Sequence, residues 1–552
     1  MAEHPTDKSR KVDVEPMASS EDSIAHGTVM DADDDLLRHI GYKQEFRREF
    51  TRWSTLSYAI SIMGVLGSVP ASWSSPLAAG GPATAIWCWF SGSFFALCIA
   101  LSIAELVSAY PTSGGMYFVT KQVFPEDKVP LAAWVIGWSN FLGQTAGVGK
   151  KYLYSAEEVK SNTKQASVGY SVGQMILAAA AMGSVQEDGT LSYTPTAEHT
   201  VALSIAILIC HGVICSFPSK TLNQLIRWFA PINILGSVAV TIALLVLTDN
   251  KHPASYVFGH VSDGSGWGSR GFSYLIGYLS VAWTMTDYDA TVRKLDIPTR
   301  RQLSILTSYR QAHISEELHN AAVSGPVAIF QAVLVTWVVG VMLNIALGFC
   351  AGNVLDTLAS PLGNPAAQVF LNAAGKKTGL ALWFWPILIQ FFTGITAMLA
   401  DTRTCFALAR DEALPLSRHL KKMNKYTQTP VFSVWAVVIV CCCLNLIALG
   451  SVQTINGIFG VTAPAMDLSY IAVIAGRLYY ENKHPIAKGP FQLGRWQKPI
   501  NYIAIVWTLF ISVILFFPPA NPVTAANMNY AVVIAGFIAL FALCWWYLGA
   551  KK

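Results

Sequence analysis

The chain has 552 residues, of which 53% are hydrophobic and 13% are charged, whereas an ordinary soluble protein carries roughly 25% charged residues. The stretches 228–248, 327–351 and 378–400 contain no Asp, Glu, Lys or Arg, and each could cross a hydrocarbon core of about 30 Å as a helix. This composition excludes an ordinary soluble protein and predicts an all-α polytopic membrane protein. The net charge of +5 does not indicate nucleic-acid binding, because the basic residues lie between the apolar stretches.

Residues 1–50 are polar, with acidic patches, and lack the basic-then-apolar pattern of a cleaved signal. We expect them to form a disordered cytosolic tail.

The ten cysteines lie almost entirely inside apolar segments, where cysteine behaves as a small buried hydrophobe. No CxxC pair is present, so neither a disulfide framework, a metal site nor a cofactor is expected.

Apolar runs predict twelve transmembrane helices after the tail. They lie near 53–74, 82–109, 130–184 (interrupted), 199–216, 228–248, 272–291, 327–350, 380–401, 431–449, 455–477, 500–518 and 529–548. If the amino terminus is cytosolic, the outer loops hold four basic residues and the inner loops fifteen, leaving out the tails and two interruptions. This excess predicts that both termini are cytosolic, because short cytosolic loops are enriched in Lys and Arg.

Two charged segments interrupt predicted helices. Residues 149–165 carry four lysines and two glutamates, and residues 292–311 separate TDYDAT from AHISEELHNAA. At mid-membrane each charge would cost roughly 3 kcal/mol. Our hypothesis is that both are retained introns, since 17 and 20 residues correspond to the lengths of short fungal introns; the alternative is a genuine re-entrant or cytosolic insertion.

The predicted organisation is a tail (1–50), a ten-span transport core (51–477), and a cytosolic loop with two peripheral spans (478–552).

Five sequence blocks carry a family resemblance. They are SIMGVLGSVPASW in span 1, AELVSAYPTSGGMYF (104–118), SEELHNAAVSGP (315–326), FALARDEALPLSRHLKKMNKYTQTP (406–430) and GPFQLGRW (489–496). With these blocks the chain resembles the amino acid–polyamine–organocation transporter superfamily, most closely its fungal amino acid, choline and 4-aminobutyrate permeases. The resemblance implies two inverted five-helix repeats, spans 1–5 and 6–10, in which spans 1 and 6 are broken halfway.

Span 1 contains its own reasons for a break, because glycine and proline weaken a helix interior and stand at positions 64, 67 and 70. A broken helix leaves backbone groups free, which is tolerated at mid-membrane only beside a cavity. The two half-helix ends attract a carboxylate and a cation respectively, which suits a zwitterionic amino acid. We therefore expect the substrate to contact the break, at residues Met63, Gly64, Val65, Gly67 and Ser68.

The other half of the expected site is the end of span 6, VAWTMTDYDAT (281–291). The resemblance places Trp283 at an aromatic position that packs over the substrate, adds Thr286 to the substrate contacts, and places Asp289 where an acidic residue commonly stands. Asp287 replaces a usual glycine and is also predicted to bind substrate.

Three interpretations of these two carboxylates stay open. At least one faces the cavity and binds a substrate ammonium or a proton, or one caps half-helix N–H groups, or span 6 ends before Asp287 and both face the inner aqueous mouth. Asp287 and Asp289 are roughly 200° apart around an ideal helix, so both can face the cavity only if the segment is unwound.

Glu105 lies about one turn before the inner end of span 2. We expect it to form an ion pair at an inner gate, with a loop arginine such as Arg403 or Arg410, rather than to contact the substrate. Asp467 follows Pro464 in span 10 and is expected either to neutralise a gate residue or to carry a proton.

Two further polar residues lie in the spans. His211 in span 4 is more typical of an interior histidine than of a proton relay. Asn233 follows Pro231 in span 5 and is expected to satisfy backbone freed by that proline.

Together these observations predict a secondary active transporter, a permease that imports an amino acid or related small amine by alternating access. No Walker motif is present, so ATP-driven transport is not expected. The resemblance implies proton coupling, for which Glu105, Asp289 and Asp467 are candidates. An α-amino acid, 4-aminobutyrate, choline or a polyamine all remain open as substrates. The expected location is the plasma membrane, and no nucleic-acid partner is expected.

Two other classes of function are less favoured by the sequence. A nutrient-sensing, transporter-like receptor would be expected to carry a longer signalling extension than the tail of about 50 residues. A membrane enzyme would need converging catalytic groups, and the His313 and His319 pair lacks Cys or carboxylate partners that would compel a metal site.

Overall fold

The computed structural model describes residues 51–110, 115–147, 168–188, 190–286, 321–410, 414, 416–450, 462–483, 487–524 and scattered residues from 528 to 544. Several sequence predictions lie outside these residues: the tail 1–50, the interruptions 149–165 and 292–311, and the carboxylates of Asp287 and Asp289. Those predictions stay predictions.

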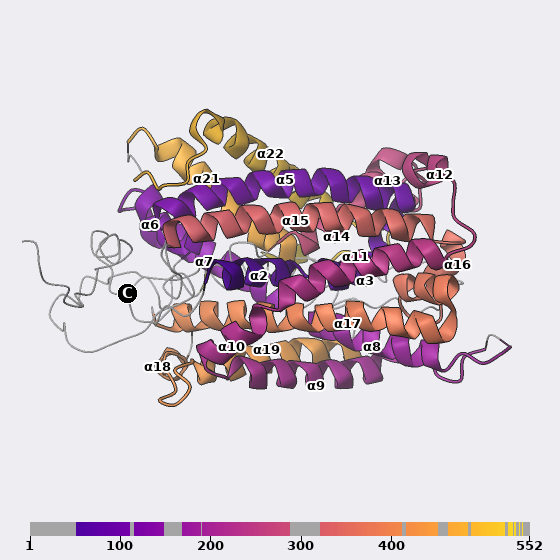
Figure 1. Cartoon of the computed structure of the whole chain (residues 1–552). Coiled ribbons are helices and arrows are strands. Elements are labelled where there is room, and N and C mark those ends of the chain that lie inside the picture. The colour runs from indigo at the N-terminus through magenta and orange to yellow at the C-terminus, as the bar shows by residue number, and fades with distance from the viewer. Residues whose placement is uncertain are drawn as a thin grey trace, which may run out of the picture.

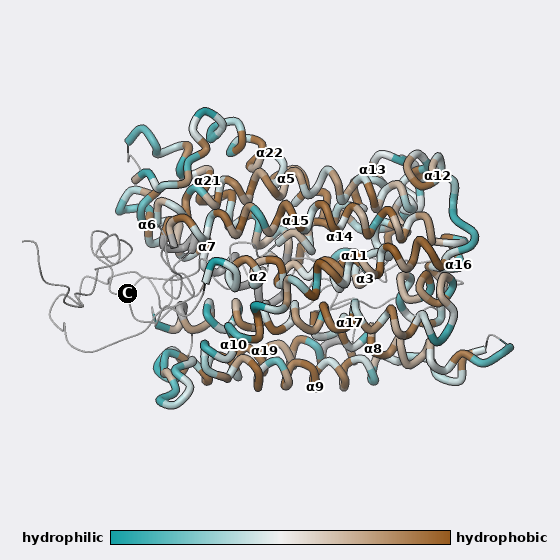
Figure 2. Tube along the Cα trace, in the orientation of Figure 1, coloured by the Kyte–Doolittle hydropathy of each residue, from teal (hydrophilic) through white to brown (hydrophobic). Residues whose placement is uncertain are grey.

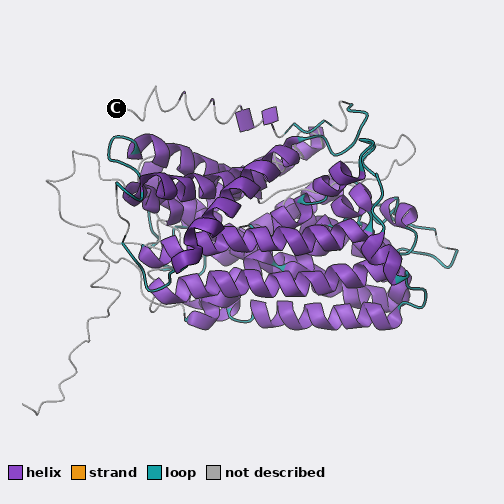
Figure 3. Cartoon of the chain, turned by 90° about the horizontal axis from the view of Figure 1, so that it is seen from above, coloured by secondary structure: helices purple, strands orange, loops and turns teal. Residues whose placement is uncertain are grey.

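The described residues form a helical bundle whose long helices run roughly along one common axis (Figure 1). Hydrophobic residues fill the length of the bundle and hydrophilic residues gather at its two ends (Figure 2), and the view from above shows the same packing of helices (Figure 3). Seven helices in the described part of the chain are long and apolar enough to cross a membrane. The prediction of an all-helical polytopic membrane protein is thus confirmed, while the twelve-span inverted repeat stays a prediction.

The helices of the amino-terminal half are α2 (Arg52–Met63), α3 (Val65–Ser72), α4 (Ser74–Gly80), α5 (Pro82–Ala109), α6 (Gly115–Val123), α7 (Val129–Gly147), α8 (Val168–Gly183), α9 (Ala197–Cys215), α10 (Ser219–Ile226), α11 (Phe229–Leu247), α12 (Ala254–Gly259), α13 (Arg270–Ile276) and α14 (Leu279–Thr284). Those of the carboxyl-terminal half are α15 (Ala321–Phe349), α16 (Val354–Leu358), α17 (Pro365–Arg410), α18 (Ser417–Leu420), α19 (Val431–Gly450), α21 (Thr462–Tyr480), the 3-10 turn η2 (Gly494–Trp496) and α22 (Gln497–Phe516).

Helices α5 and α15 pack against each other along much of their length (Figure 1). Gly340 of α15 lies directly against the indole ring of Trp89, so closely that any side chain at position 340 would overlap the ring. The buried Trp89 ring donates a hydrogen bond from Nε1 to the Trp337 carbonyl at 3.2 Å. A missing side chain on one helix therefore makes room for the largest side chain on the other.

Helix α17 is longer than the sequence predicted. Its 46 residues include a kink at Gly375 (φ 67°), and the helix runs on to Arg410 beyond the predicted end at 401. The apolar signal stops at Asp401, but Asp401 and Arg403 are buried in the protein, at 5% and 6% exposure. The assignment of Arg403 and Arg410 to a loop was wrong, because polar residues inside a bundle can continue a helix that hydropathy alone would end.

Candidate functional site

The predicted interruption of span 1 is present and falls on one residue. Helix α2 ends and α3 begins at Gly64, which has a left-handed conformation (φ 43°, ψ 55°). Its N–H donates to the Ile60 carbonyl at 3.0 Å, and its own carbonyl accepts from the N–H groups of Gly67 and Ser68 at 2.9 and 2.8 Å. Glycine suits this left-handed conformation because it has no Cβ to clash with the neighbouring backbone.

Asn233 of α11 bridges the two half-helices. Its Oδ1 accepts from the Leu66 N–H at 3.4 Å and its Nδ2 donates to the Ile60 carbonyl at 3.5 Å. A carboxamide can do both because it carries an acceptor and two donors. The expectation that Asn233 would serve backbone freed by Pro231 was therefore wrong, since the amide bonds instead to a helix break that lies far away in sequence.

Helix α17 supplies the other polar groups at the break. Thr393 Oγ1 donates to the Ser61 carbonyl at 2.9 Å. Gln390 accepts from Ser68 Oγ at 3.3 Å and donates to Ser171 Oγ of α8 at 2.9 Å. Sequence reasoning missed Gln390 and Thr393, although two polar residues one helical turn apart in an uncharged apolar run were a signal that could have found them.

The glycines of the break face α17. A side chain on Gly64 would overlap the Thr393 hydroxyl, and a Cβ on Gly67 would lie 2.6 Å from the Gln390 backbone nitrogen. The flanking Met63 and Val65 are buried, as is Ser68. The structure thus brings the predicted span 1 residues together with one face of α17.

Helix α14 ends at Thr284, close to the predicted break in span 6. Its residues pack against α3, and the hydroxyls of Ser72 and Ser280 lie 2.7 Å apart. Trp283 and Thr286 are both buried, and Thr286 Oγ1 donates to the Trp283 carbonyl at 2.8 Å. The described parts of spans 1 and 6 are therefore neighbours.

Asp467 and His211 have different surroundings. Asp467 is buried in α21 and, with Tyr278, Met285 and Trp507, lines a cavity of about 20 Å³, enough for about one water molecule. The His211 ring packs on Phe391 with centroids 4.6 Å apart. It also fills the space beside Gly394, as expected of an interior histidine.

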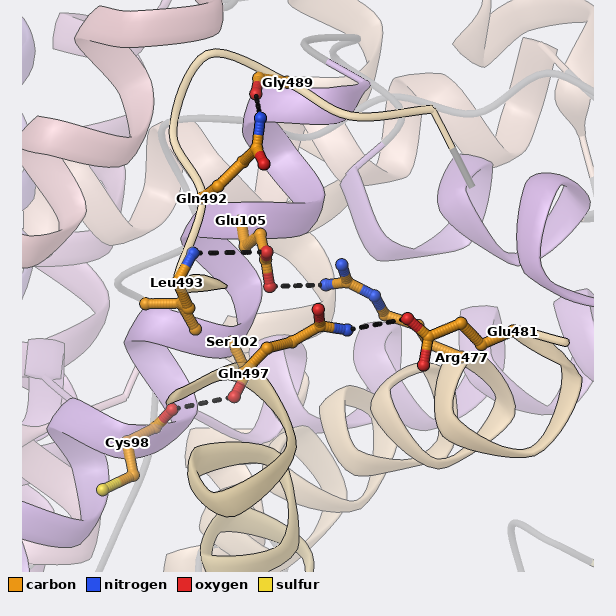
Figure 4. Close-up of polar contacts among 9 residues, drawn as sticks. All are labelled: Cys98, Ser102, Glu105, Arg477, Glu481, Gly489, Gln492, Leu493 and Gln497. Atoms are coloured by element: carbon orange, nitrogen blue, oxygen red, sulfur yellow. Dashed lines mark hydrogen bonds and ion pairs between the residues drawn. The ribbon is translucent and has the colours of Figure 1, made fainter. Parts of the chain in front are cut away.

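Glu105 forms a buried ion pair at the end of the bundle that the sequence predicts to be cytosolic. Arg477 Nη1 of α21 donates to Glu105 Oε2 at 2.9 Å, and both side chains are at most 10% exposed. The backbone N–H of Leu493 donates to the other carboxylate oxygen at 3.3 Å. Figure 4 shows Arg477 and Leu493 approaching Glu105 from two sides. The predicted ion pair exists, but its partner is Arg477 rather than Arg403 or Arg410.

The block GPFQLGRW lies against the block AELVSAY. The Phe491 N–H donates to Ser108 Oγ at 2.8 Å, and the Ala487 N–H donates to the Tyr110 hydroxyl at 3.1 Å. Gly489 touches the Ser108 backbone so closely that no side chain would fit there. Two motifs almost 400 residues apart in sequence therefore form one structural unit at the end of α5.

This arrangement defines a class of protein: a polytopic helical membrane protein with a buried, polar helix break and a buried ion pair at one end. Discontinuous helices of this kind form solute sites in membrane transporters. Among the described residues no group of three or more His, Cys, Asp or Glu is placed to hold a metal ion.

Comparison with known proteins gives the family. Residues 50–295 and 308–539 match the Amino acid permease family, and the chain belongs to it. The members of this family are transporters and not enzymes. The gap in the match, 296–307, lies within the interruption 292–311, whereas the match runs without a gap across 149–165.

Three relatives cover almost the whole chain. An uncharacterized amino-acid permease of Schizosaccharomyces pombe is 43% identical over 95% of this chain and 89% of its own length. Amino-acid permease 2 of Neurospora crassa is 35% identical over 93% of this chain and 87% of its own length. The amino-acid permease BAT1 of Arabidopsis thaliana is 26% identical over 95% of this chain and 96% of its own length. The chain is thus an amino acid permease in the family sense, for amino acids or related solutes.

Proposed function

We propose that this permease imports an amino acid by proton-coupled alternating access at the plasma membrane. The observation that carries the proposal is the interruption of span 1 at Gly64, deep in the bundle and surrounded by polar groups from α11 and α17. Two half-helix ends of opposite polarity that meet inside the bundle suit a zwitterion. The relatives are named amino-acid permeases, which favours an amino acid, 4-aminobutyrate included, over choline or a polyamine.

The placement of the described residues supports a division of roles. The break residues Met63, Gly64, Val65, Gly67 and Ser68 form one side of the substrate site, and Gly64 and Gly67 act in part by letting α17 approach. Across from them, Trp283 and Thr286 form the second side, with Asp287 or Asp289 binding the substrate ammonium or the proton. Asp467 is the second candidate proton carrier, because a buried carboxylate in a membrane protein marks a pathway for charge.

Uptake of a radiolabelled panel in a permease-deficient fungal strain tests this function. The panel holds the twenty amino acids, 4-aminobutyrate, choline and a polyamine. We expect saturable accumulation of at least one amino acid, abolished by a protonophore and reduced at least tenfold by Asp289→Ala at equal surface amount. Accumulation of none of the panel, or accumulation that a protonophore leaves intact, would overturn the proposal.

A further inference from the structure

We propose that residues 487–496, here named the latch, hold the α5 and α21 end of the bundle closed and release it in each transport cycle. This inference rests on the proposed alternating access. The sequence predicted this segment to be part of the cytosolic loop before two peripheral spans. Its contacts are instead concentrated on the last turns of α5, which carry a buried carboxylate.

The latch contributes to the pairing of Glu105. A buried carboxylate is stable only when its charge is matched and its oxygens are hydrogen-bonded. One oxygen accepts from Arg477, and the other accepts from the latch backbone at Leu493. The latch therefore completes the environment of the charge, and its departure leaves one oxygen for water or another donor.

Ser108 joins three segments of the chain through one hydroxyl. Its Oγ donates to the Ala322 carbonyl at the start of α15 and accepts from the Phe491 N–H, both at 2.8 Å. Ser108 is 1% exposed. Separating the latch from α5 breaks this bond and the one from Ala487 to Tyr110, so the contacts are lost together.

The close contact between the latch and α5 requires glycine at position 489. Gly489 is buried and lies so close to the backbone of Ser108 and Ala109 that a Cβ would be 2.5 Å from the Ala109 nitrogen and closer still to Ser108. A backbone obstacle cannot rotate away as a side chain can. Only glycine allows the latch to seat here.

The latch also leads directly into α22, which packs against α5 and α21. The Phe95 and Trp507 rings stack with centroids 3.8 Å apart, and the side-chain amide of Gln497, at the start of α22, lies beside Arg477 and Glu481 (Figure 4). Movement at the end of α5 is therefore mechanically connected to a helix outside the predicted ten-span core.

A cysteine reporter tests the latch without depending on transport. Ala109→Cys places a thiol at a buried position beside Gly489, and a maleimide–polyethylene glycol reagent in isolated membranes reports its exposure by a gel shift. The same chain without this substitution gives the background from native cysteines. We expect Gly489→Ala and Glu105→Gln each to increase the labelling rate at least threefold, while Gly259→Ala, where a Cβ meets nothing within 4 Å, leaves it unchanged.

A second measurement separates a moving latch from a merely structural contact. An equimolar mixture of the twenty amino acids, added to the reporter chain without other changes, is expected to raise the labelling rate about twofold, because cycling opens the latch. Labelling unchanged in both variants, or unchanged by the mixture in a chain that accumulates amino acids, overturns the latch. Absence of uptake with increased labelling in the variants would instead count against the transport function alone.

Discussion

The carboxamide of Asn233 is suited to a helix break in a way that a charged or apolar side chain is not. Its oxygen accepts from the Leu66 N–H, and its nitrogen donates a second hydrogen bond to the Ile60 carbonyl, which already accepts from the Gly64 N–H. An unsatisfied buried polar group costs about 1–3 kcal/mol, and this neutral residue removes that cost at the Leu66 N–H. The break stays stable without an ion at this point.

Asn233→Ala should therefore lower the thermal stability of the purified protein by several degrees, since about 1–3 kcal/mol is lost when the buried Leu66 N–H has no acceptor. Asn233→Asp should be as harmful, because it removes the donor to Ile60 and buries a charge. Tryptophan fluorescence melting in detergent measures the effect. Asn372→Ala, at an exposed position, serves as the control; equal melting temperatures for all three variants would contradict the role given to Asn233.

At the scale of helices, glycines decide how closely neighbours approach. Gly67 allows α3 to touch the backbone of α17 at Gln390, and Gly340 allows α15 to close over the Trp89 ring. Close approach brings the hydroxyl of Ser68 within reach of Gln390, which in turn reaches Ser171 of α8. Three helices are thus joined by polar bonds at the level of the break because one of them lacks a side chain.

Gly67→Ala should push α3 away from α17, since its Cβ would lie 2.6 Å from a backbone nitrogen that cannot rotate aside. Overpacking of this kind costs about 1–3 kcal/mol, and we expect at least a tenfold loss of uptake per molecule at the surface. Gly271→Ala, whose nearest neighbour atom lies 3.9 Å away, is the matched control. Uptake by the Gly67 variant equal to that of the control would show that close approach is not required.

At the scale of the whole molecule, the two charged interruptions determine which form of the chain is functional. The family match omits 296–307, inside the segment 292–311. This supports our proposal that the segment is not part of the functional chain. The match gives no such support for 149–165, which it crosses without a gap.

Expression of the chain with and without 292–311 tests the proposal directly. Removal should raise the amount of protein at the surface and the uptake of amino acids severalfold, because charges at mid-membrane cost roughly 3 kcal/mol each. Removal of 149–165 is measured alongside, alone and in combination. A mature transcript that retains both segments, or better uptake by the full chain, would show that they are genuine insertions.

Much of the fold was predictable because its causes are local. Lipid requires each spanning segment to be apolar and to satisfy its own backbone, so composition alone indicated helices such as α11 and α15. The left-handed turn at Gly64 was also predictable as a weak point, because glycine and proline impose their backbone preferences wherever they stand.

The sequence by itself therefore determined the class of protein, the seven long apolar helices that the structure describes, and the position of the first helix break. Only the tertiary structure decided which residues complete the break and which close the predicted cytosolic end. Arg477 lies 372 residues from Glu105, and Gln390 lies 322 from Ser68; such partners are chosen by how whole helices pack. A polar residue inside an apolar segment indicates from the sequence alone that it needs a hydrogen-bond partner. Which residue becomes that partner depends on how the helices of the bundle pack.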